Sequence, residues 1–307
     1  MVASDRPFRR QVVKVLAQVL LGRRRAHYHA WLPSLRIENR TAGAPGEVRY
    51  RGRRVFGLSG LDALTSRIGS HVLIVGSGPS AAGADLRGLP PRRALLLNGA
   101  IGLAGGGLAG DGLAEPLAVA IEDERFVWRH FAMIAQHVGA GIPMLLSVGA
   151  IRALCDIDAG FLSGRPVILI DDIRKPYGRP RRTEDELAAL DPVTLSGAAG
   201  FSAAPSTGVF QGGSVVVSAL QFAMAGTAAG IGFIGVDITN ADAPRFYEQA
   251  GEAAYSGVAS AERRILDHIA LARDVAAARG LRLVNHSPVS ALRSIGLDYV
   301  PFDQSAA

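Results

Sequence analysis

A glycine-rich loop with the residue types of a phosphate-binding turn occupies residues 76–80. Its sequence is Gly76-Ser77-Gly78-Pro79-Ser80, and it follows a short apolar run. Glycines let a backbone turn tightly and bring amide groups close to a phosphate, and a helix starting near Pro79 would add the positive end of its dipole. The loop therefore predicts a phosphate-bearing ligand.

The same loop fits the GxGxxA variant of the dinucleotide fingerprint through Gly76, Gly78 and Ala81. That fingerprint also needs an acidic residue at the end of the next strand, where it holds the ribose hydroxyls of NAD. The next apolar run ends at Asn98, and residues 86–110 contain no Asp or Glu. The sequence thus favours a nucleotide over a dinucleotide. Asn98 either contacts a base or ribose or only occupies the turn that follows.

Acidic residues follow a third apolar run, in the segment Glu122-Asp123-Glu124-Arg125-Phe126. A carboxylate at the carboxyl end of a central strand faces the ligand crevice, where it suits a general base or a metal ligand. Asp is also a favoured helix N-cap, and a helix is expected to start here. Both interpretations of Asp123 stay open, and we expect Glu122 and Glu124 to face solvent.

Two later segments combine small hydroxyl, acidic and cationic side chains. The loop Ala204-Pro205-Ser206-Thr207-Gly208 precedes a helical stretch, and hydroxyl groups at a helix start either bind phosphate, carboxylate or sugar groups or act only as caps. Another apolar run ends with Asp237 and Thr239, and Arg245 and Tyr247 follow. An Arg and a Tyr near the end of a strand could stabilise the charge of a departing phosphate.

The hydropathy pattern predicts the elements that must position these residues. Apolar runs of strand length alternate with helix-length segments, which predicts an α/β fold with a Rossmann-like, mostly parallel sheet and helices on both faces. The predicted strands are His71–Gly76, Ala94–Asn98, Leu117–Ile121, Pro143–Val148, Pro166–Ile170, Gly230–Asp237 and Leu281–Asn285. The predicted helices are Glu124–Val138, Gly212–Ala225 and Ala259–Arg279.

The chain divides into an N-terminal segment over residues 1–69, with an Arg- and Gly-rich connector at Glu38–Arg54, and a ligand-binding domain over residues 70–307. A small lid is expected at about residues 171–200, since this segment begins with a stretch dense in charge and proline. Ser214–Val236 is apolar enough to resemble a membrane span, but its glycines and polar residues divide it into a helix and a buried strand.

Positive charge is concentrated at the N-terminus. The chain has a formal net charge of +6 at pH 7, and residues 1–25 contain seven Arg or Lys residues against one Asp. Apolar residues from Phe8 to Leu20 fall at helical spacing, and Val15–Leu21 is too short for a signal peptide core or a membrane span. The segment predicts a basic amphipathic helix. It either lies on an anionic membrane surface through residues 6–25 or packs on the domain with its charges outward.

Composition excludes several other classes of protein. Among the 307 residues, 49% are hydrophobic and 20% are charged, which excludes disorder and collagen-like repeats. Because the charge of residues 26–307 is balanced, a nucleic-acid partner is not expected. The single cysteine, Cys155, cannot form an intramolecular disulfide, and no CxxC or HxxxH cluster supplies structural zinc ligands. A reducing, cytoplasmic setting is therefore expected.

Six segments taken together resemble a known family. They are GSGPS (76–80), LLLNGA (95–100), EDERF (122–126), STG (206–208), GVDITNADAPRFYE (235–248) and LVNHSPVSAL (283–292). Their order and spacing resemble the bacterial Kdo transferases of the lipopolysaccharide core, in particular those that add the third Kdo. These are distantly similar to the bacterial sialyltransferases that use CMP-sialic acid. The resemblance covers roughly residues 70–302.

The resemblance implies an inverting glycosyltransferase with a lid and a GT-A-like, sialyltransferase-type variant of the Rossmann-like fold. It implies CMP-Kdo as donor, a lipid A or core oligosaccharide as acceptor, and a cytoplasmic location peripheral on the inner membrane. It implies no cofactor and no essential metal, since CMP leaves as one monoanion rather than as a diphosphate.

The resemblance also assigns roles position by position. The glycine-rich loop would cradle the CMP phosphate and ribose, and the 206–208 loop would hold the donor carboxylate and phosphate. Asp237 would be the acidic residue that ends the nucleotide-site strand. The implied donor-binding residues are Gly76, Ser77, Gly78, Ser80, Asn98, Ser206, Thr207, Gly208, Asp237 and Thr239.

Two departures from the sialyltransferases change the catalytic assignment. Those enzymes use a His as general base in the stretch that matches Tyr255–Val258, where this chain has none. Asp123 becomes the candidate base. Thr239 replaces a Tyr, so the resemblance assigns leaving-group stabilisation to Arg245 and Tyr247. His286 is a further candidate acid or base, against the alternative of a structural histidine.

Three other functions remain open from the sequence. The first is a sialyltransferase-like enzyme that uses another CMP-activated sugar for surface polysaccharide. The second is an NAD(P)-dependent oxidoreductase that uses the glycine-rich loop as a dinucleotide fingerprint. The third is a catalytically inactive scaffold that binds sugar nucleotides in a membrane assembly complex.

Overall fold

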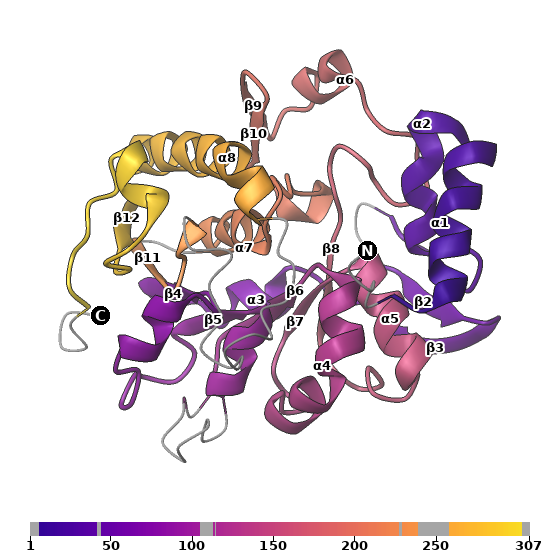
Figure 1. The fold of residues 1–307 in the computed structure, drawn as a ribbon, viewed down its shortest axis with the longest axis horizontal. Helices are drawn as coiled ribbons and strands as arrows, with labels where there is room; N and C mark the ends of the chain where they lie inside the picture. The colour runs from indigo at the N-terminus through magenta and orange to yellow at the C-terminus, as the bar shows by residue number, and fades with distance from the viewer. Residues whose placement is uncertain are drawn as a thin grey trace.

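A seven-stranded sheet with the strand order β12-β11-β4-β5-β6-β7-β8 forms the centre of the molecule (Figure 1). The computed structural model describes residues 6–41, 44–104, 113, 115–226, 229–238 and 258–302. Every neighbouring pair in the sheet is parallel. The strands are β4 (His71–Val75), β5 (Ala94–Leu97), β6 (Ala118–Ile121), β7 (Met144–Ser147), β8 (Val167–Ile170), β11 (Gly230–Ile234) and β12 (Arg282–Asn285).

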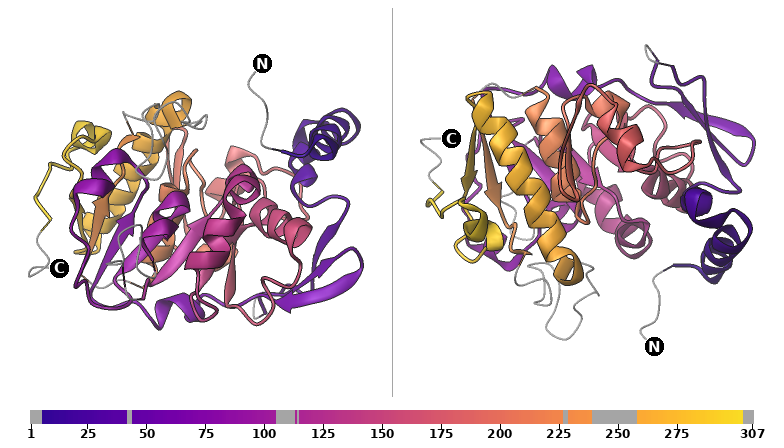
Figure 2. Two further views of the ribbon diagram at one scale, coloured as in Figure 1. Left: turned by 60° about the horizontal axis from the view of Figure 1, so that its bottom comes forward. Right: turned by 90° about the horizontal axis from the view of Figure 1, so that it is seen from above.

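These strands confirm the predicted α/β class, the parallel Rossmann-like sheet and all seven predicted strands. Apart from the edge strand β12, each strand is apolar along nearly its whole length because helices cover both faces of the sheet. Successive side chains, such as those of Ile74 and Val75, therefore enter two separate cores. The first core is shared with α7 (Val215–Met224) and α8 (Val258–Ala278), and the second with α4 (Glu124–His137) and α5 (Val148–Ile157). Figure 2 shows these two layers with the bottom of the molecule turned forward and from above.

The order of the strands reverses at β4. The chain runs from β4 to β8 in one direction and then returns to place β11 and β12 on the other side of β4. The boundary between β4 and β11 is therefore a topological switch point, where α/β proteins bind ligands outside the carboxyl ends of the strands. The loop at residues 76–80 follows β4, and Asp237 follows β11.

An antiparallel sheet of three strands includes the Arg- and Gly-rich connector at Glu38–Arg54, for which no strand was predicted. Val48 and Tyr50 alternate with outward-facing residues and join the second core. Arg51 and Gly52 have positive φ angles of 49° and 80°, which suits the two-residue turn of a hairpin. The strands are β1 (Leu35–Glu38), β2 (Glu47–Tyr50) and β3 (Arg53–Gly57).

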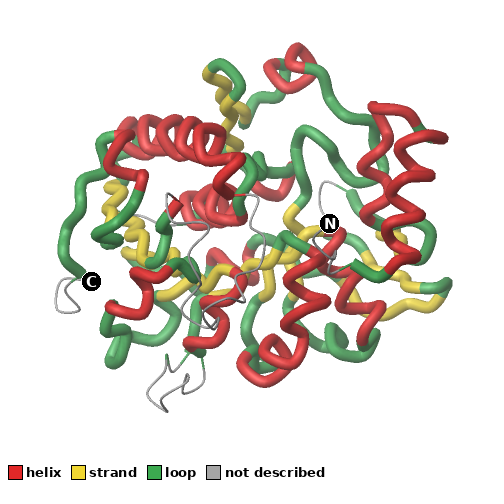
Figure 3. The backbone as a smooth tube through the Cα atoms, viewed as in Figure 1, coloured by secondary structure: helices red, strands yellow, loops and turns green. Residues whose placement is uncertain are grey.

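The remaining elements lie around these layers, as the tube in Figure 3 shows. The β9–β10 hairpin, preceded by α6, stands at the top of Figure 1 in the segment expected to be a lid. With η for 3₁₀ helices, these elements are α1 (Phe8–Leu20), α2 (Gly22–Arg25), η1 (Ala26–Ala30), α3 (Asp62–Thr65), η2 (Pro79–Gly83), η3 (Asn98–Leu103), α6 (Glu184–Ala188), β9 (Val193–Ser196), β10 (Ala199–Ser202), η4 (Pro205–Thr207) and η6 (Ala291–Ile295).

A buried cluster of charged side chains fastens α1 to the domain. Arg152 on α5 is 1% exposed and forms ion pairs with Glu124 and, at 2.6 Å, with Asp156. On the N-terminal side, Arg6 pairs with the same Glu124. Arg10 is buried and donates hydrogen bonds to the backbone carbonyls of His29, in η1, and Leu32, just after it. The helix thus meets the domain largely through cations.

The apolar side of α1 faces outward as a result. Its buried residues are Arg10 and Ala17, so the predicted helix is confirmed but does not pack through its apolar stripe. Within the described ranges, no helix is long and apolar enough to cross a membrane. The stripe consists of six residues with exposed fractions between 41% and 79%, namely Phe8, Val12, Val15, Leu16, Val19 and Leu20.

Replacing Arg152 by Met should lower the free energy of unfolding by about 3 kcal/mol, because it leaves Glu124 and Asp156 buried without their shared cation. Arg51→Met is the matched control, since Arg51 lies 3.7 Å from the same Asp156 but is 59% exposed. The control should cost less than about 1 kcal/mol. Urea denaturation of both variants measures the difference. Equal urea midpoints would show that the burial of Arg152 does not matter.

Candidate functional site

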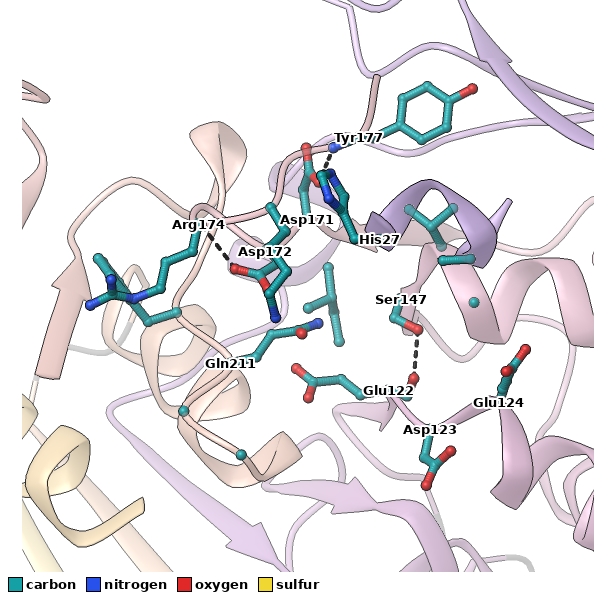
Figure 4. Close-up of a pocket in the computed structure, with 18 of the residues that line it drawn as sticks. His27, Glu122, Asp123, Glu124, Ser147, Asp171, Asp172, Arg174, Tyr177 and Gln211 are labelled. Carbon is teal, nitrogen blue, oxygen red and sulfur yellow. Dashed lines mark hydrogen bonds and ion pairs between the residues drawn. The ribbon is translucent and has the colours of Figure 1, made fainter. Parts of the chain in front are cut away.

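The carboxyl ends of β6, β7 and β8 open into a cavity of about 720 Å³ (Figure 4). Residues 122–125 after β6, Ser147 at the end of β7, and Asp171 and Asp172 after β8 line it from the sheet. The N-terminal segment contributes His27, His29, Ala30 and Trp31, and the stretch before α7 contributes residues 210–213. Segments far apart in the chain therefore share one cavity at the edge of the sheet where ligands are expected.

Glu122 is the first residue after β6, and its side chain points into this cavity (Figure 4). Its Oε1 atom is buried and has no hydrogen-bond partner. Burial raises the pKa of Glu122 to about 8, an effect that the neighbouring Ser218 hydroxyl partly offsets. Ser147 holds the backbone in place by donating a hydrogen bond of 2.6 Å to the Glu122 carbonyl. The expectation that Glu122 faces solvent is therefore wrong.

The two acidic residues that follow Glu122 are occupied by other interactions. Asp123 caps α4 by accepting a hydrogen bond of 2.9 Å from the Arg125 amide, and the Arg125 side chain pairs with it at 2.5 Å. Glu124 is 6% exposed and belongs to the buried cluster around Arg152, which also corrects the expectation that it faces solvent. The cap interpretation of Asp123 is confirmed, and its role as a base stays a prediction.

The loops after β4 and β11 close on each other. The Gly78 amide donates to the Gly235 carbonyl at 2.9 Å, and Ser80 donates to Asp237 through its amide, at 2.7 Å, and through its hydroxyl. A β-carbon added to Gly78 would lie 2.6 Å from Asp237 Oδ2. The glycine therefore permits the close approach of two loops, and the structure joins the predicted residues Gly76–Ser80 and Asp237 into one unit.

This arrangement corrects the predicted phosphate cradle. The amides of Gly76, Gly78 and Ser80 already donate to the β11 strand and its loop, and the Gly76 bond to the Ile234 carbonyl measures 2.7 Å. The segment from Pro79 is a five-residue 3₁₀ helix and carries no long helix dipole. The loop in this conformation binds its neighbouring strand rather than presenting those amides to a ligand, and Ser77 lies half-buried between them.

Asn98 follows β5, the strand next to β4. Its φ angle is 46°, in the left-handed region that Asn tolerates better than most residues, so the turn interpretation is confirmed. Its Oδ1 atom is buried and has no hydrogen-bond partner. The protein encloses this oxygen, so the contact of Asn98 with a nucleotide stays a prediction.

The loop at residues 206–208 lies elsewhere. Gly208 packs against Asp171 and Ile173, directly after β8. The Thr207 hydroxyl donates to the Ala204 carbonyl at 2.8 Å, and Ser206 is exposed. Four strand spacings separate β8 from β4, or about 19 Å. The structure therefore does not bring Ser206, Thr207 and Gly208 to the glycine-rich loop.

Several predicted residues cannot be compared with the structure. Thr239, Arg245 and Tyr247 lie outside the described residues, as do residues 255–257, so their roles stay predictions. His286 is described, and its Nδ1 atom lies 2.8 Å from the Val300 carbonyl oxygen. It lines a second cavity of about 290 Å³ that shares no residue with the first. In the described ranges, no group of three or more His, Cys, Asp and Glu residues could hold a metal ion.

The sequence analysis did not select Asp171 and Asp172 as site residues. Their position just after an apolar run of strand length is the same feature that selected Asp123. Both directly follow a predicted strand. Asp171 pairs with Arg40 at 2.5 Å and accepts a hydrogen bond of 2.9 Å from the Tyr177 amide. Asp172 lies 3.5 Å from Lys175 and faces the cavity. The aromatic wall formed by His27, Trp31 and Tyr177 could not be predicted from a local sequence pattern. Only the fold brings residues 27–31 to the end of β8.

Comparison of the chain with protein-family models, with curated proteins and with solved structures found no match. The candidate site therefore depends on the residues and geometry described above.

Gly78→Ala should lower the free energy of unfolding by about 1–3 kcal/mol, because the new methyl group would overlap Asp237 and force the two loops apart. Gly83→Ala is the matched control, since a β-carbon there has no neighbour within 4 Å. The control should change stability by less than about 0.5 kcal/mol. Thermal denaturation of the two variants tests the prediction, and equal melting temperatures would contradict it.

Proposed function

We propose that the protein is an inverting glycosyltransferase that transfers Kdo from CMP-Kdo to a lipid A or inner-core acceptor of lipopolysaccharide. One observation carries this proposal. Three of the segments that resemble the Kdo transferases, containing Gly78, Asn98 and Asp237, end adjacent strands on both sides of the topological switch point. Segments separated by more than a hundred residues thus meet where a nucleotide binds in this class of sheet. A sialyltransferase-type variant of the GT-A-like fold is part of the proposal.

In the proposed site for CMP-Kdo, hydrogen-bond acceptors bind the nucleoside, and an Arg and a Tyr stabilise the leaving phosphate. The unpartnered Asn98 Oδ1 accepts a hydrogen bond from an amino or hydroxyl group of the CMP moiety. Asp237 holds the glycine-rich loop through Ser80 and offers its remaining lone pairs to ribose hydroxyls. Arg245 and Tyr247 stabilise the departing CMP, and a single cation suffices for one phosphate without a metal.

Adding CMP or CDP should raise the melting temperature by several degrees, and NADH should not. A ligand at about 100 times its dissociation constant stabilises the folded state by about 2.7 kcal/mol. The same rise is expected with and without EDTA, since the proposed site needs no metal. Asn98→Asp, which suits the same backbone conformation but adds a negative charge, should abolish the rise. Stabilisation by NADH and none by CMP would favour the oxidoreductase instead.

Turnover separates the remaining alternatives. Incubation with CMP-Kdo and a lipid A precursor should release CMP, whereas CMP-sialic acid should not support release above background. The reverse preference would identify an enzyme for another CMP-activated sugar. Binding of CMP with no turnover of any donor would identify an inactive scaffold.

We also propose that α1 places the enzyme peripherally on an anionic membrane surface, at the cytoplasmic face of the inner membrane. Its apolar stripe is exposed along the whole helix. Arg23, Arg24 and Arg25 are exposed directly after it on α2. Insertion of the apolar side chains favours any bilayer, and each Arg near anionic headgroups adds about 1 kcal/mol. The charge beside the stripe therefore favours an anionic membrane over a protein partner.

The double variant Leu16→Asp/Val19→Asp should lose binding to phosphatidylglycerol vesicles in a flotation assay. Gln11→Asp/Gln18→Asp adds the same charge to exposed polar positions of the same helix and should retain most of the binding. Phosphatidylcholine vesicles should bind the wild-type protein weakly. A wild-type protein that ignores vesicles but forms a dimer through this stripe would assign the surface to a second copy of the chain.

A further inference from the structure

The cavity at the ends of β6, β7 and β8 contains five carboxylates that meet cations and one that does not. Asp123 pairs with Arg125, Asp171 with Arg40, and Asp172 with Lys175. Glu124 and Glu184 also pair with arginines. Within the described part of the chain, Glu122 makes no ion pair, and its Oε1 is buried without a hydrogen-bond partner. A carboxyl group that lines a roomy polar cavity without a paired cation is the one best placed to exchange a proton with a ligand there.

We infer that Glu122 is the general base of sugar transfer and that the cavity it faces receives the acceptor hydroxyl. This inference rests on the proposed function, because it assigns the second substrate of the same reaction. Two strand spacings, or about 10 Å, separate the end of β6 from the end of β4. The distance suits a nucleotide bound at the switch point whose sugar extends along the sheet edge toward Glu122.

The groups around Glu122 keep its carboxyl group weakly acidic. Asp172 and Asp123 both raise its pKa further, and Arg125 and Lys175 pair with those two carboxylates. Arg174 pairs with Glu184, and Arg264 donates to the Gly212 carbonyl at 3.0 Å. A base with a pKa near 8 takes up a proton more strongly than an ordinary carboxylate, which is what activation of a hydroxyl requires.

The opposite wall suits a sugar acceptor. The ring of Trp31 lies 4.7 Å from that of Tyr177 and 5.7 Å from that of His27, between centroids. Aromatic rings with polar edges are typical of pockets that bind polar ligands with apolar faces. This wall directly follows α1 and α2 in the chain, so an acceptor anchored in a membrane under α1 would lie beside the cavity.

The proposed step balances without a co-reactant. The acceptor oxygen forms a bond to the anomeric carbon of the donor, and the bond from that carbon to the CMP phosphate oxygen breaks. The electron pair of the broken bond leaves with CMP. The proton of the acceptor hydroxyl moves to the Glu122 carboxylate and is later released to water.

Glu122→Gln should reduce kcat at least 100-fold with CMP-Kdo and a lipid A precursor, the usual loss when a general base is removed. In the wild-type protein kcat should rise with pH to a plateau above a pH of about 8, since the base acts only when deprotonated. The residual activity of the variant should lose this dependence. Glu38→Gln, the same change on a partly exposed side chain of β1 outside the cavity, is the control.

A second readout does not need turnover. The folded protein keeps a proton on Glu122 that the unfolded chain has already lost between a pH of about 4.5 and about 8. The wild-type protein should therefore lose stability across this range relative to Glu122→Gln. The melting temperature of the variant minus that of the wild type should increase from pH 5 to pH 8.

The outcomes separate the inference from the proposed function. A constant difference in melting temperature from pH 5 to pH 8 would overturn the assignment of Glu122 even if the enzyme is active. An active wild type with an equally active Glu122→Gln variant would do the same, and loss of activity in Asp123→Asn alone would make Asp123 the base. Lack of turnover by the wild type with every CMP-activated sugar would instead overturn the proposed function, and with it the role of Glu122 in transfer.

Discussion

The buried guanidinium of Arg152 is the interaction on which the arrangement of the N-terminal half depends. A cation that is 1% exposed must be neutralised, and Glu124 and Asp156 neutralise it from α4 and α5. Because these carboxylates also attract Arg6 and Arg9, the first helix is held by its cations. Its apolar stripe then has no place in the domain and faces outward. The same attachment brings residues 27–31 to the cavity.

The parallel sheet provides two separate sites along the edge formed by the carboxyl ends of its strands. At the switch point, the loops after β4 and β11 are locked together by hydrogen bonds from Gly78 and Ser80. Beyond β5, the edge opens into the cavity that holds Glu122. A reaction between two substrates needs this kind of division, because donor and acceptor must approach the same point from different sides. Asn98 and Glu122 follow the neighbouring strands β5 and β6, where the edge passes from the switch point to the cavity.

The candidate site could be predicted only in part. Asn98, Asp123 and Asp237 were recognisable because each follows an apolar run, and the carboxyl ends of parallel strands share an edge. The segment Glu122–Glu124 was recognisable as acidic, but its division into base, cap and ion-pair partner was not. That division depends on which carboxylate meets Arg125, which meets Arg152, and which meets neither. The cation Arg152 lies on α5, a helix with no counterpart among the expected elements.

By itself the sequence determined the fold class, the seven central strands and the basic helix, because apolar periodicity and length are local properties of the chain. Tertiary structure decided which way that helix faces and which donors remain free. The amides of the glycine-rich loop fit a phosphate cradle until β11 approaches and takes their hydrogen bonds. The loop at residues 206–208 follows β8 rather than joining the switch point. Hydrogen bonds and ion pairs are satisfied by whatever partner the fold brings near, and a linear pattern does not contain that partner.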